Sequence, residues 1–220
     1  MNKYLFDNVF TLLYDSYKGS VVRSFTIGIV FFILLAFSMD AKIIDIDTKT
    51  SQEISKRFGK QSAKRIHYLN SHFESKKQLY KAKNIKVLEE VNKFYNRLTY
   101  LKDIDHWRKD DYWATLIEFV ATGAGDSEDF AMAKLYTLLY FGFSLDKFEL
   151  MQDTKKNPYA KIQDDEHIVL VYKHTPTSRP IMLDSVYPKL KIIKEKNRLI
   201  PIKKSKWIIK KTLQTMTRYP

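Results

Sequence analysis

The 220-residue sequence contains no cysteine. This absence excludes disulfide bonds, metal sites with thiolate ligands and a thiol nucleophile in the chain as it stands. It leaves the cellular compartment open, because many exported bacterial proteins also lack disulfides.

Glycine and proline are scarce as well, with six residues of each, and the chain has neither a low-complexity tract nor an internal repeat. A hydrophobic fraction of 45% and an aromatic fraction of 14% are enough for a packed core, which excludes disorder over most of the chain. A chain of this length holds one domain and an N-terminal appendage.

Acidic residues are fewer than basic ones, and the net charge is +13. Such a charge first suggests nucleic acid as a partner, but the 25 acidic residues are interspersed with the 38 basic ones. The densest basic segment, residues 189–211, has ten Lys or Arg against Glu195 and is interrupted by Leu and Ile. That pattern is typical of solvated lysines on strand or helix edges. We therefore predict no nucleic-acid partner, while attraction to an anionic membrane surface stays open.

A long hydrophobic run is missing too, because the uncharged apolar segment near the front, residues 25–37, has only thirteen residues. Thirteen residues suit the apolar part of a secretory signal better than a bilayer span. Extension to residues 21–39 would give a marginal signal anchor. Lys18 and Arg23 precede the segment, which places the following domain outside the cytoplasm. The sequence thus predicts a signal peptide or signal anchor over residues 1–40 and a periplasmic domain over residues 50–220, soluble or anchored to the inner membrane.

Helical periodicity dominates the first half of that domain. Hydrophobic residues recur at helical spacing between residues 50 and 101. Residues 123–125 (GAG) then break the chain, and a helix is predicted over residues 126–141, with Asp126 or Ser127 as its N-cap. The period afterwards changes to that of strands, at residues 148–152, 167–172 and 180–184. Helices followed by antiparallel strands make an α+β domain.

The last two predicted strands form a hairpin that permits a geometric inference. If Thr175 and Pro176 lie at its centre, His167 is directly opposite Asp184. The imidazole and the carboxylate would then be close enough to form a hydrogen bond. A register error of one residue would move a side chain to the other face. Ser127, at a helix N-terminus, would complete a set of nucleophile, base and acid. Taken alone, such a serine is more often a helix cap than a nucleophile, and such a His–Asp pair is more often a surface hydrogen bond.

Several motifs resemble those of the bacterial transglutaminase-like cysteine proteinases of the LapG type. They are DDYWAT at 110–115, GAGDSEDFAMAK at 123–134, VNKFYN at 91–96, HIVLVY at 167–172 and PIMLDS at 180–185. The resemblance implies a papain-like, transglutaminase-like fold, in which the nucleophile helix packs on an antiparallel sheet. It also implies the catalytic roles of three positions: nucleophile Ser127, general base His167 and orienting acid Asp184.

The resemblance further implies a calcium site and two protein partners. Members of the family bind Ca²⁺ with the acids that flank the nucleophile, which here are Asp126, Glu128 and Asp129. Oxygen ligands of this kind suit that ion. Members cleave the N-terminal region of a large surface adhesin at a paired-alanine site, which releases biofilm, and an inner-membrane cyclic di-GMP receptor holds them inactive. Acyl transfer between Gln and Lys uses the same triad, but the motifs favour hydrolysis.

The chain departs from the family at the nucleophile, where GDSED replaces GDCED. A serine hydroxyl is much harder to deprotonate than a thiol, whose pKa is about 8.5. Three explanations are open: an engineered inactive enzyme, a natural pseudo-protease that binds adhesin or receptor without cutting, and a working serine variant. A smaller departure is Ser185, where the family usually has asparagine.

Overall fold

The structure is a computed structural model that describes residues 42–80, 83–154, 167–187, 189–194, 198–202 and 205–216. The chain divides into two units, Met1–Ala41 and Lys42–Pro220, and the described residues all belong to the second. The predicted signal segment over residues 1–40 lies outside the described residues. Within the described ranges, no helix has both the length and the apolar character needed to cross a bilayer.

Helices occupy most of the first half of the described chain, and strands follow them. The helices are α3 Thr48–Phe58, α4 Gln61–Glu74, α5 Lys77–Tyr80, α6 Ile85–Tyr95, α7 Asp103–His106, α8 Leu116–Thr122, α9 Ser127–Tyr140, the 3-10 turn η1 Leu145–Lys147 and α10 Ser205–Leu213. The strands are β1 Thr99–Tyr100, β2 Ala124–Gly125, β3 Phe148–Asp153, β4 Ile168–Tyr172, β5 Ile181–Leu183, β6 Lys191–Ile192 and β7 Leu199–Pro201. The predicted α+β class is confirmed, and the three predicted strands correspond to β3, β4 and β5.

The main sheet is antiparallel and has five strands in the order β6-β5-β4-β3-β7. Two short strands, β1 and β2, form a separate parallel pair just before the start of α9. At the edge of the main sheet, Arg198 donates two hydrogen bonds of 2.8 and 2.6 Å to the buried carboxylate of Asp153, which ties the chain leading into β7 to the end of β3.

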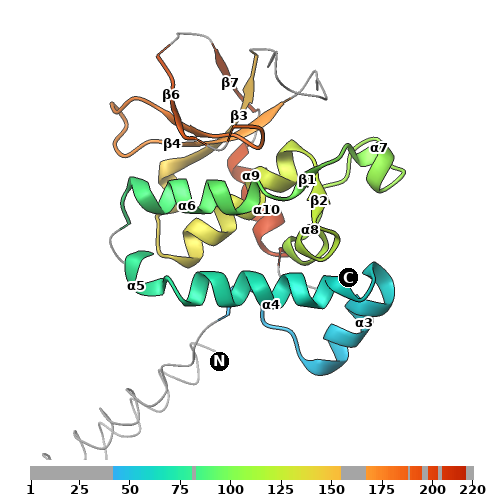
Figure 1. Cartoon of the computed structure of the whole chain (residues 1–220). Coiled ribbons are helices and arrows are strands. Elements are labelled where there is room, and N and C mark those ends of the chain that lie inside the picture. Colours follow the sequence, from blue (N-terminus) through green and yellow to red (C-terminus); the bar gives the residue numbers. More distant parts are fainter. Residues whose placement is uncertain are drawn as a thin grey trace, which may run out of the picture. The chain divides into compact units, whose positions relative to one another are not determined.

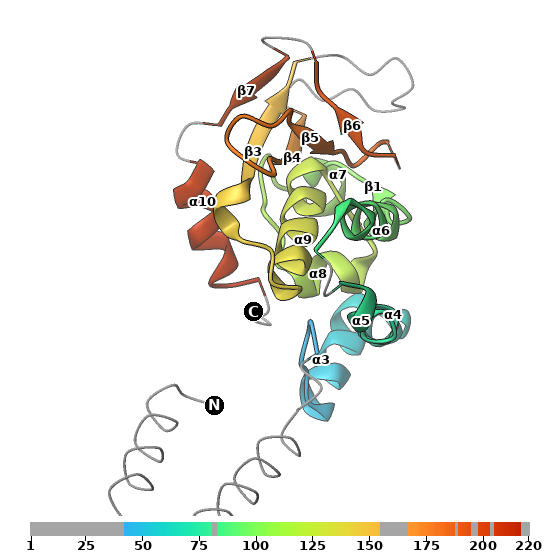
Figure 2. The ribbon, with the colours of Figure 1, turned by 90° about the vertical axis from the view of Figure 1, so that its left-hand side faces the viewer.

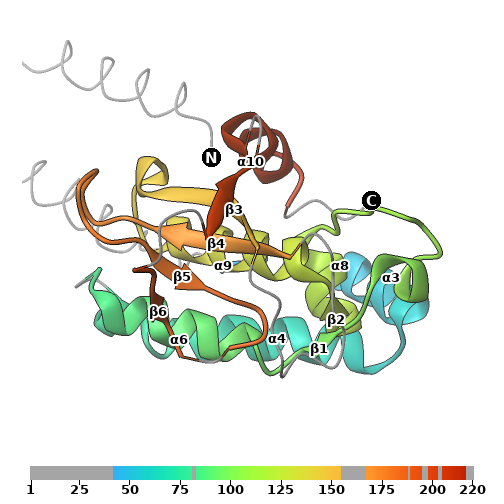
Figure 3. The ribbon, with the colours of Figure 1, turned by 90° about the horizontal axis from the view of Figure 1, so that it is seen from above.

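One helix, α9, lies directly beneath the main sheet and packs on β4 (Figure 2). Its other sides are covered by α6 and α8, and α4 and α3 form a further layer beyond α8 (Figure 1). Seen from above the sheet, α10 lies beside β3 and β7, and α6 lies on the side of β5 and β6 (Figure 3). Because α9 is enclosed on all sides, ten of its residues are buried, and a single apolar stripe would not suffice.

The turn before α9 is fixed by the end of α8. Thr115 and Glu118 form a capping box at the start of α8, and Gly123 ends the helix in the left-handed conformation with φ of 73°. Gly125 follows in β2, where a Cβ atom would lie only 2.5 Å from Asp129 Oδ2 and 2.7 Å from Phe119 Cδ2. The two glycines predicted to break the chain therefore have different roles. Gly123 ends α8, and Gly125 allows the backbone to lie close to Asp129 and Phe119.

Candidate active site

Ser127 is the first residue of α9 and follows the N-cap residue Asp126. Asp126 occupies the N-cap position, but its side chain makes no capping hydrogen bond to the helix. The Ser127 side chain is buried, with 2% of its surface exposed. Its hydroxyl accepts a hydrogen bond from the Ile168 backbone N–H at 3.0 Å and donates one to Glu128 Oε2 at 3.1 Å. The Ile168 contact joins the start of the helix to the start of β4.

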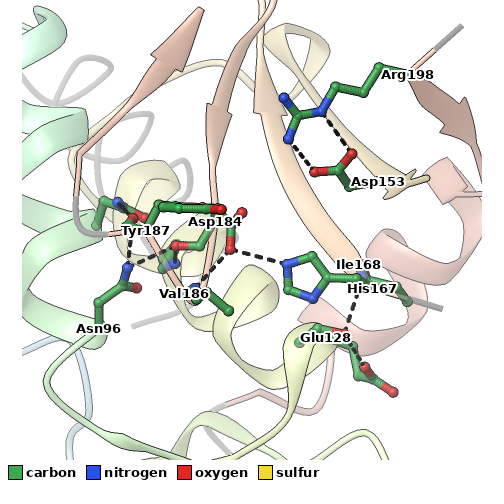
Figure 4. Close-up of polar contacts among 12 residues, drawn as sticks. Asn96, Glu128, Asp153, His167, Ile168, Asp184, Val186, Tyr187 and Arg198 are labelled. Carbon is green, nitrogen blue, oxygen red and sulfur yellow. Dashed lines mark hydrogen bonds and ion pairs between the residues drawn. The ribbon is translucent and has the colours of Figure 1, made fainter. Parts of the chain in front are cut away.

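His167 and Asp184 lie at neighbouring strand ends, just before β4 and just after β5. Nε2 of His167 is 3.0 Å from Oδ1 of Asp184 (Figure 4). An ionised carboxylate only accepts hydrogen bonds, so Nε2 carries the proton of the neutral ring and Nδ1 is left as a base. In Figure 4 the ring lies between Asp184 on one side and Ile168 and Glu128 on the other. The predicted base and acid are thus in contact, and Ile168, adjacent to His167, links them to the nucleophile position.

The predicted register of the hairpin was wrong by two residues. Leu170 pairs with Leu183 and Tyr172 with Ile181, so the position opposite Asp184 is Val169 and not His167. The turn is centred one residue later than Thr175 and Pro176 would place it. An error of two residues leaves every side chain on the same face, and the histidine side chain still reaches the carboxylate diagonally across the sheet.

The Asp184 carboxylate is almost completely buried and is held in place by its neighbours. Besides His167, the Val186 N–H donates to the same oxygen, Oδ1, at 2.7 Å. Burial opposes ionisation, but the hydrogen bond and the charge of His167 outweigh it, so the pKa of Asp184 is lowered below its ordinary value. Asp184 is therefore charged at neutral pH and can orient the imidazole and balance its positive charge.

The main chain after Asp184 is fixed by side chains from two helices. Asn96, at the end of α6, donates to the Asp184 carbonyl at 2.8 Å and to the Tyr187 carbonyl at 2.9 Å (Figure 4). Lys134, on α9, donates to the Asp184 carbonyl at 2.9 Å. Both residues fall within the quoted family motifs, but no role was predicted for either, because the sequence gives no sign of which backbone carbonyl a buried amide or amine will reach.

The acids that flank Ser127 form a cluster with two further aspartates. Ligand oxygens of Asp103, Asp126 and Asp129 lie within 4.8 Å of one another, as do those of Asp103, Asp111 and Glu128. Asp126, Glu128 and Asp129 were predicted as metal ligands, and the structure brings them together. Asp103 and Asp111 were missed because they come from α7 and the loop after it, and nothing in their local pattern indicates that this loop folds over the start of α9.

Three oxygen atoms in this cluster are buried and have no hydrogen-bond partner among the described residues: Asp103 Oδ1, Asp126 Oδ1 and Asp129 Oδ2. In two of these residues, the other carboxylate oxygen accepts a hydrogen bond. Ala114 N–H donates to Asp129 Oδ1 at 2.8 Å, and Tyr112 N–H donates to Asp103 Oδ2. Buried polar atoms are rarely left unsatisfied. Several converging carboxylate oxygens of this kind fit a hard divalent cation such as Ca²⁺.

Electrostatics support the same conclusion. Burial, followed by repulsion from Glu128 and Asp129, raises the pKa of Asp126 to about 10. Burial is also the main cause that raises the pKa of Glu128 and of Asp129 above their ordinary values. In the absence of positive charge, the cluster therefore holds protons that free carboxyl groups would lose at neutral pH.

The model of the family described as bacterial transglutaminase-like cysteine proteinase BTLCP matches residues 51–197. No curated protein matches the chain. The chain is similar to solved structures of LapG from Legionella pneumophila, with 29% identity, a TM-score of 0.52 and coverage of 72% of this chain and 83% of that one. A calcium-bound form of that protein (71% and 82% covered) and an EGTA-treated form (72% and 81% covered) match with the same identity and TM-score.

Proposed function

The chain belongs to the bacterial transglutaminase-like cysteine proteinases, and from this premise we propose a calcium-dependent endopeptidase of the LapG type. Its substrate in this proposal is the N-terminal region of a large surface adhesin, and the chain is catalytically silent while Ser127 occupies the nucleophile position. The observation that carries the proposal is the His167–Asp184 pair, 3.0 Å between Nε2 and Oδ1, next to the start of α9.

The chemistry follows from these three positions once cysteine stands at position 127. His167 takes the thiol proton, and the sulfur attacks the carbonyl carbon of the scissile peptide bond. The bond between that carbon and nitrogen breaks as His167 returns the proton to the leaving amine. Water then attacks the thioester, which releases the acid product and restores the thiol. Asp184 keeps the imidazole oriented throughout. A serine hydroxyl in the same place loses its proton far less readily.

Calcium belongs to the proposal because the carboxylates converge beside the nucleophile. Asp103, Asp111, Asp126, Glu128 and Asp129 would hold the ion, which supplies positive charge against their mutual repulsion. The LapG structures from Legionella pneumophila include a calcium-bound form, which supports the same ion here.

We place the protein in the periplasm, soluble or anchored to the inner membrane. Support comes from the uncharged segment 25–37 and from Lys18 and Arg23 before it. An inner-membrane cyclic di-GMP receptor is part of the same proposal, as the partner that would regulate access to the site. Fractionation of cells that express the full chain should recover it in the periplasmic extract or with the inner membrane. Recovery in the cytoplasm would contradict this location.

A non-catalytic binding protein is the second candidate, and Ser127 is the observation that favours it. Such a protein would bind adhesin or receptor and keep the calcium site while cutting nothing. The two candidates predict the same binding partner, so only restoration of the nucleophile separates them.

The test uses an adhesin N-terminal fragment that contains a paired-alanine site. The unaltered chain, Ser127→Cys, and Ser127→Cys combined with His167→Ala are each incubated with it, with calcium and with chelator. We expect cleavage only by Ser127→Cys with calcium. If that variant does not cut but the unaltered chain binds the fragment, the protein is a binding protein. If the fragment is neither cut nor bound, the proposed substrate is wrong.

A further inference from the structure

Lys134 is a fully buried lysine of α9 that the triad chemistry does not use. It comes seven residues after Ser127, two helical turns along the same face of the helix, a rise of about 10 Å. Among the described residues, its amine donates one hydrogen bond, to the Asp184 main-chain carbonyl at 2.9 Å, and lies 5.6 Å from the centre of the Phe130 ring. A lysine in such a position is costly, because burial strongly disfavours the ammonium form.

The position of that hydrogen bond suggests what the amine does. It connects the helix that presents the nucleophile to the residue that presents the acid, so α9 and the end of β5 are fixed relative to each other from inside the protein. Asn96 donates to the same carbonyl from α6 at 2.8 Å. The Asp184 carboxylate, in turn, reaches His167 from a backbone that both contacts hold. Asn96 and Lys134 both donate to the Asp184 carbonyl and thereby position the acid. Of the two, only Lys134 belongs to the nucleophile helix.

We propose that Lys134 is a positioning residue, whose hydrogen bond to the Asp184 carbonyl sets the distance between the nucleophile helix and the His167–Asp184 pair. The part of this inference that concerns catalysis rests on the proposed function. The structural part can be tested separately, because the contact exists in the unaltered chain and the state of His167 can be measured there.

The proposal can be tested with a variant that removes the amine and fills the same space. Methionine has a similar length and no charge, and replacement of buried charged groups by apolar ones of similar volume is often neutral or stabilising. In Lys134→Met, the Asp184 carbonyl keeps Asn96 as a donor. We therefore expect Lys134→Met to fold with an unfolding midpoint no lower than that of the unaltered chain.

The first readout is the tautomer of His167, measured by ¹⁵N NMR in the full chain with Ser127 in place. In the unaltered chain, we expect the neutral ring to carry its proton on Nε2 alone. In Lys134→Met, we expect a mixture of tautomers, because Asp184 no longer holds a single position. Lys76→Met is the matched control: its Nζ pairs with Glu90 at 2.7 Å in a different part of the fold, so it should leave His167 unchanged. An unchanged His167 in Lys134→Met would overturn the proposal.

The second readout is cleavage kinetics in the Ser127→Cys background. Lys134→Met should lower kcat by about ten- to a hundredfold and leave KM within about twofold, because it misplaces the reacting groups and not the substrate. In a background that also carries Asp184→Ala, Lys134→Met should have no further effect. Equal losses in both backgrounds would mean a general structural role and contradict the proposal. If Ser127→Cys does not cut at all, the proposed function fails, while the tautomer measurement still decides the role of Lys134.

If methionine prevents folding, Lys134→Gln provides the test. It keeps an N–H donor on a side chain that is shorter by one bond. The fraction of neutral His167 rings protonated at Nε2 in this variant should then lie between the values of two other chains. These are the unaltered chain and Lys134→Ala, which lacks the hydrogen bond. A tautomer in Lys134→Gln equal to that of Lys134→Ala, with both chains folded, would contradict the proposal.

Discussion

At the scale of single residues, the hydroxyl of Ser127 lies in surroundings that suit a sulfur anion better than an oxygen nucleophile. The Ile168 N–H and the start of α9 both stabilise negative charge at this position. His167 can take a proton through Nδ1. A thiol ionises more readily than a hydroxyl in such surroundings, because the hydroxyl has a far higher pKa. In the proposed function, Ser127 is therefore the one residue that separates the silent chain from an active one.

Gly125 is a second residue on which the site depends. We expect Gly125→Ala to weaken or abolish calcium binding, because its Cβ would meet Asp129 Oδ2 at 2.5 Å and displace a carboxylate of the cluster. Calcium titration by calorimetry checks this result. Gly59→Ala is the matched control: its φ of 89° makes alanine strained, but its Cβ would meet nothing within 4 Å. That variant should lose stability and keep the calcium affinity. Equal affinities in all three chains would contradict the role of Asp129.

Lys134 makes the free energy of unfolding depend on pH. Burial, partly offset by the charge of Asp184, lowers its pKa from 10.5 to about 7 in the folded protein. Between these values the unfolded chain binds more protons, so this residue raises stability as pH increases from about 7 to about 10. The stability advantage of Lys134→Met should thus be largest below that range and shrink as pH rises through it. Denaturant unfolding of both chains across the range checks the trend, and an advantage that grows with pH would contradict it.

At the scale of elements, the start of α9 and the segment made of α7 and the loop after it together form two groups of acids that share Asp103. α9 supplies Glu128 and Asp129, with Asp126 just before it, and the other segment supplies Asp103 and Asp111. A cation bound between them would connect the two segments directly beside the nucleophile. Loss of the cation would leave the buried carboxylates to repel one another, so the geometry at position 127 would depend on the metal.

This arrangement predicts that calcium stabilises the fold more at high pH than at low pH. The raised pKa values of Asp126, Glu128 and Asp129 mean that the folded apo protein binds more protons than the unfolded chain. Their contribution to stability therefore falls as pH rises above the ordinary range of a carboxyl group, and calcium relieves the penalty. The calcium-induced rise in Tm should be larger at about pH 8 than at about pH 5.

The control for this prediction is the double variant Asp126→Asn/Asp129→Asn. Amides neither titrate nor repel each other, so the variant should lose most of the calcium-induced shift at both pH values. A shift in the unaltered chain that is equal at both pH values, or greater at the lower one, would contradict the assignment of this cluster.

At the scale of the whole molecule, the sequence predicted the α+β class, the central helix and three strands, because each has a clear period or a clear break. The contact between His167 and Asp184 was also predicted, although through a register two residues away from the observed one. Turn geometry, which sets register, cannot be read from KHTPTSR. Asp103 and Asp111 were missed for a related reason: only tertiary packing brings α7 and the loop after it to α9.

The match over residues 51–197 establishes the family of the chain. The proposed function requires that the site activates a thiol at position 127. Because the chain contains no other cysteine, Ser127→Cys creates a single thiol, and its rate of alkylation by iodoacetamide can be followed against pH without any knowledge of the substrate.

With calcium present, we expect this thiol to react with an apparent pKa well below the ordinary value of about 8.5. The shift should disappear when His167→Ala is added. A thiol that titrates near its ordinary pKa in both variants would contradict the claim that Ser127, His167 and Asp184 occupy the catalytic positions of a cysteine proteinase.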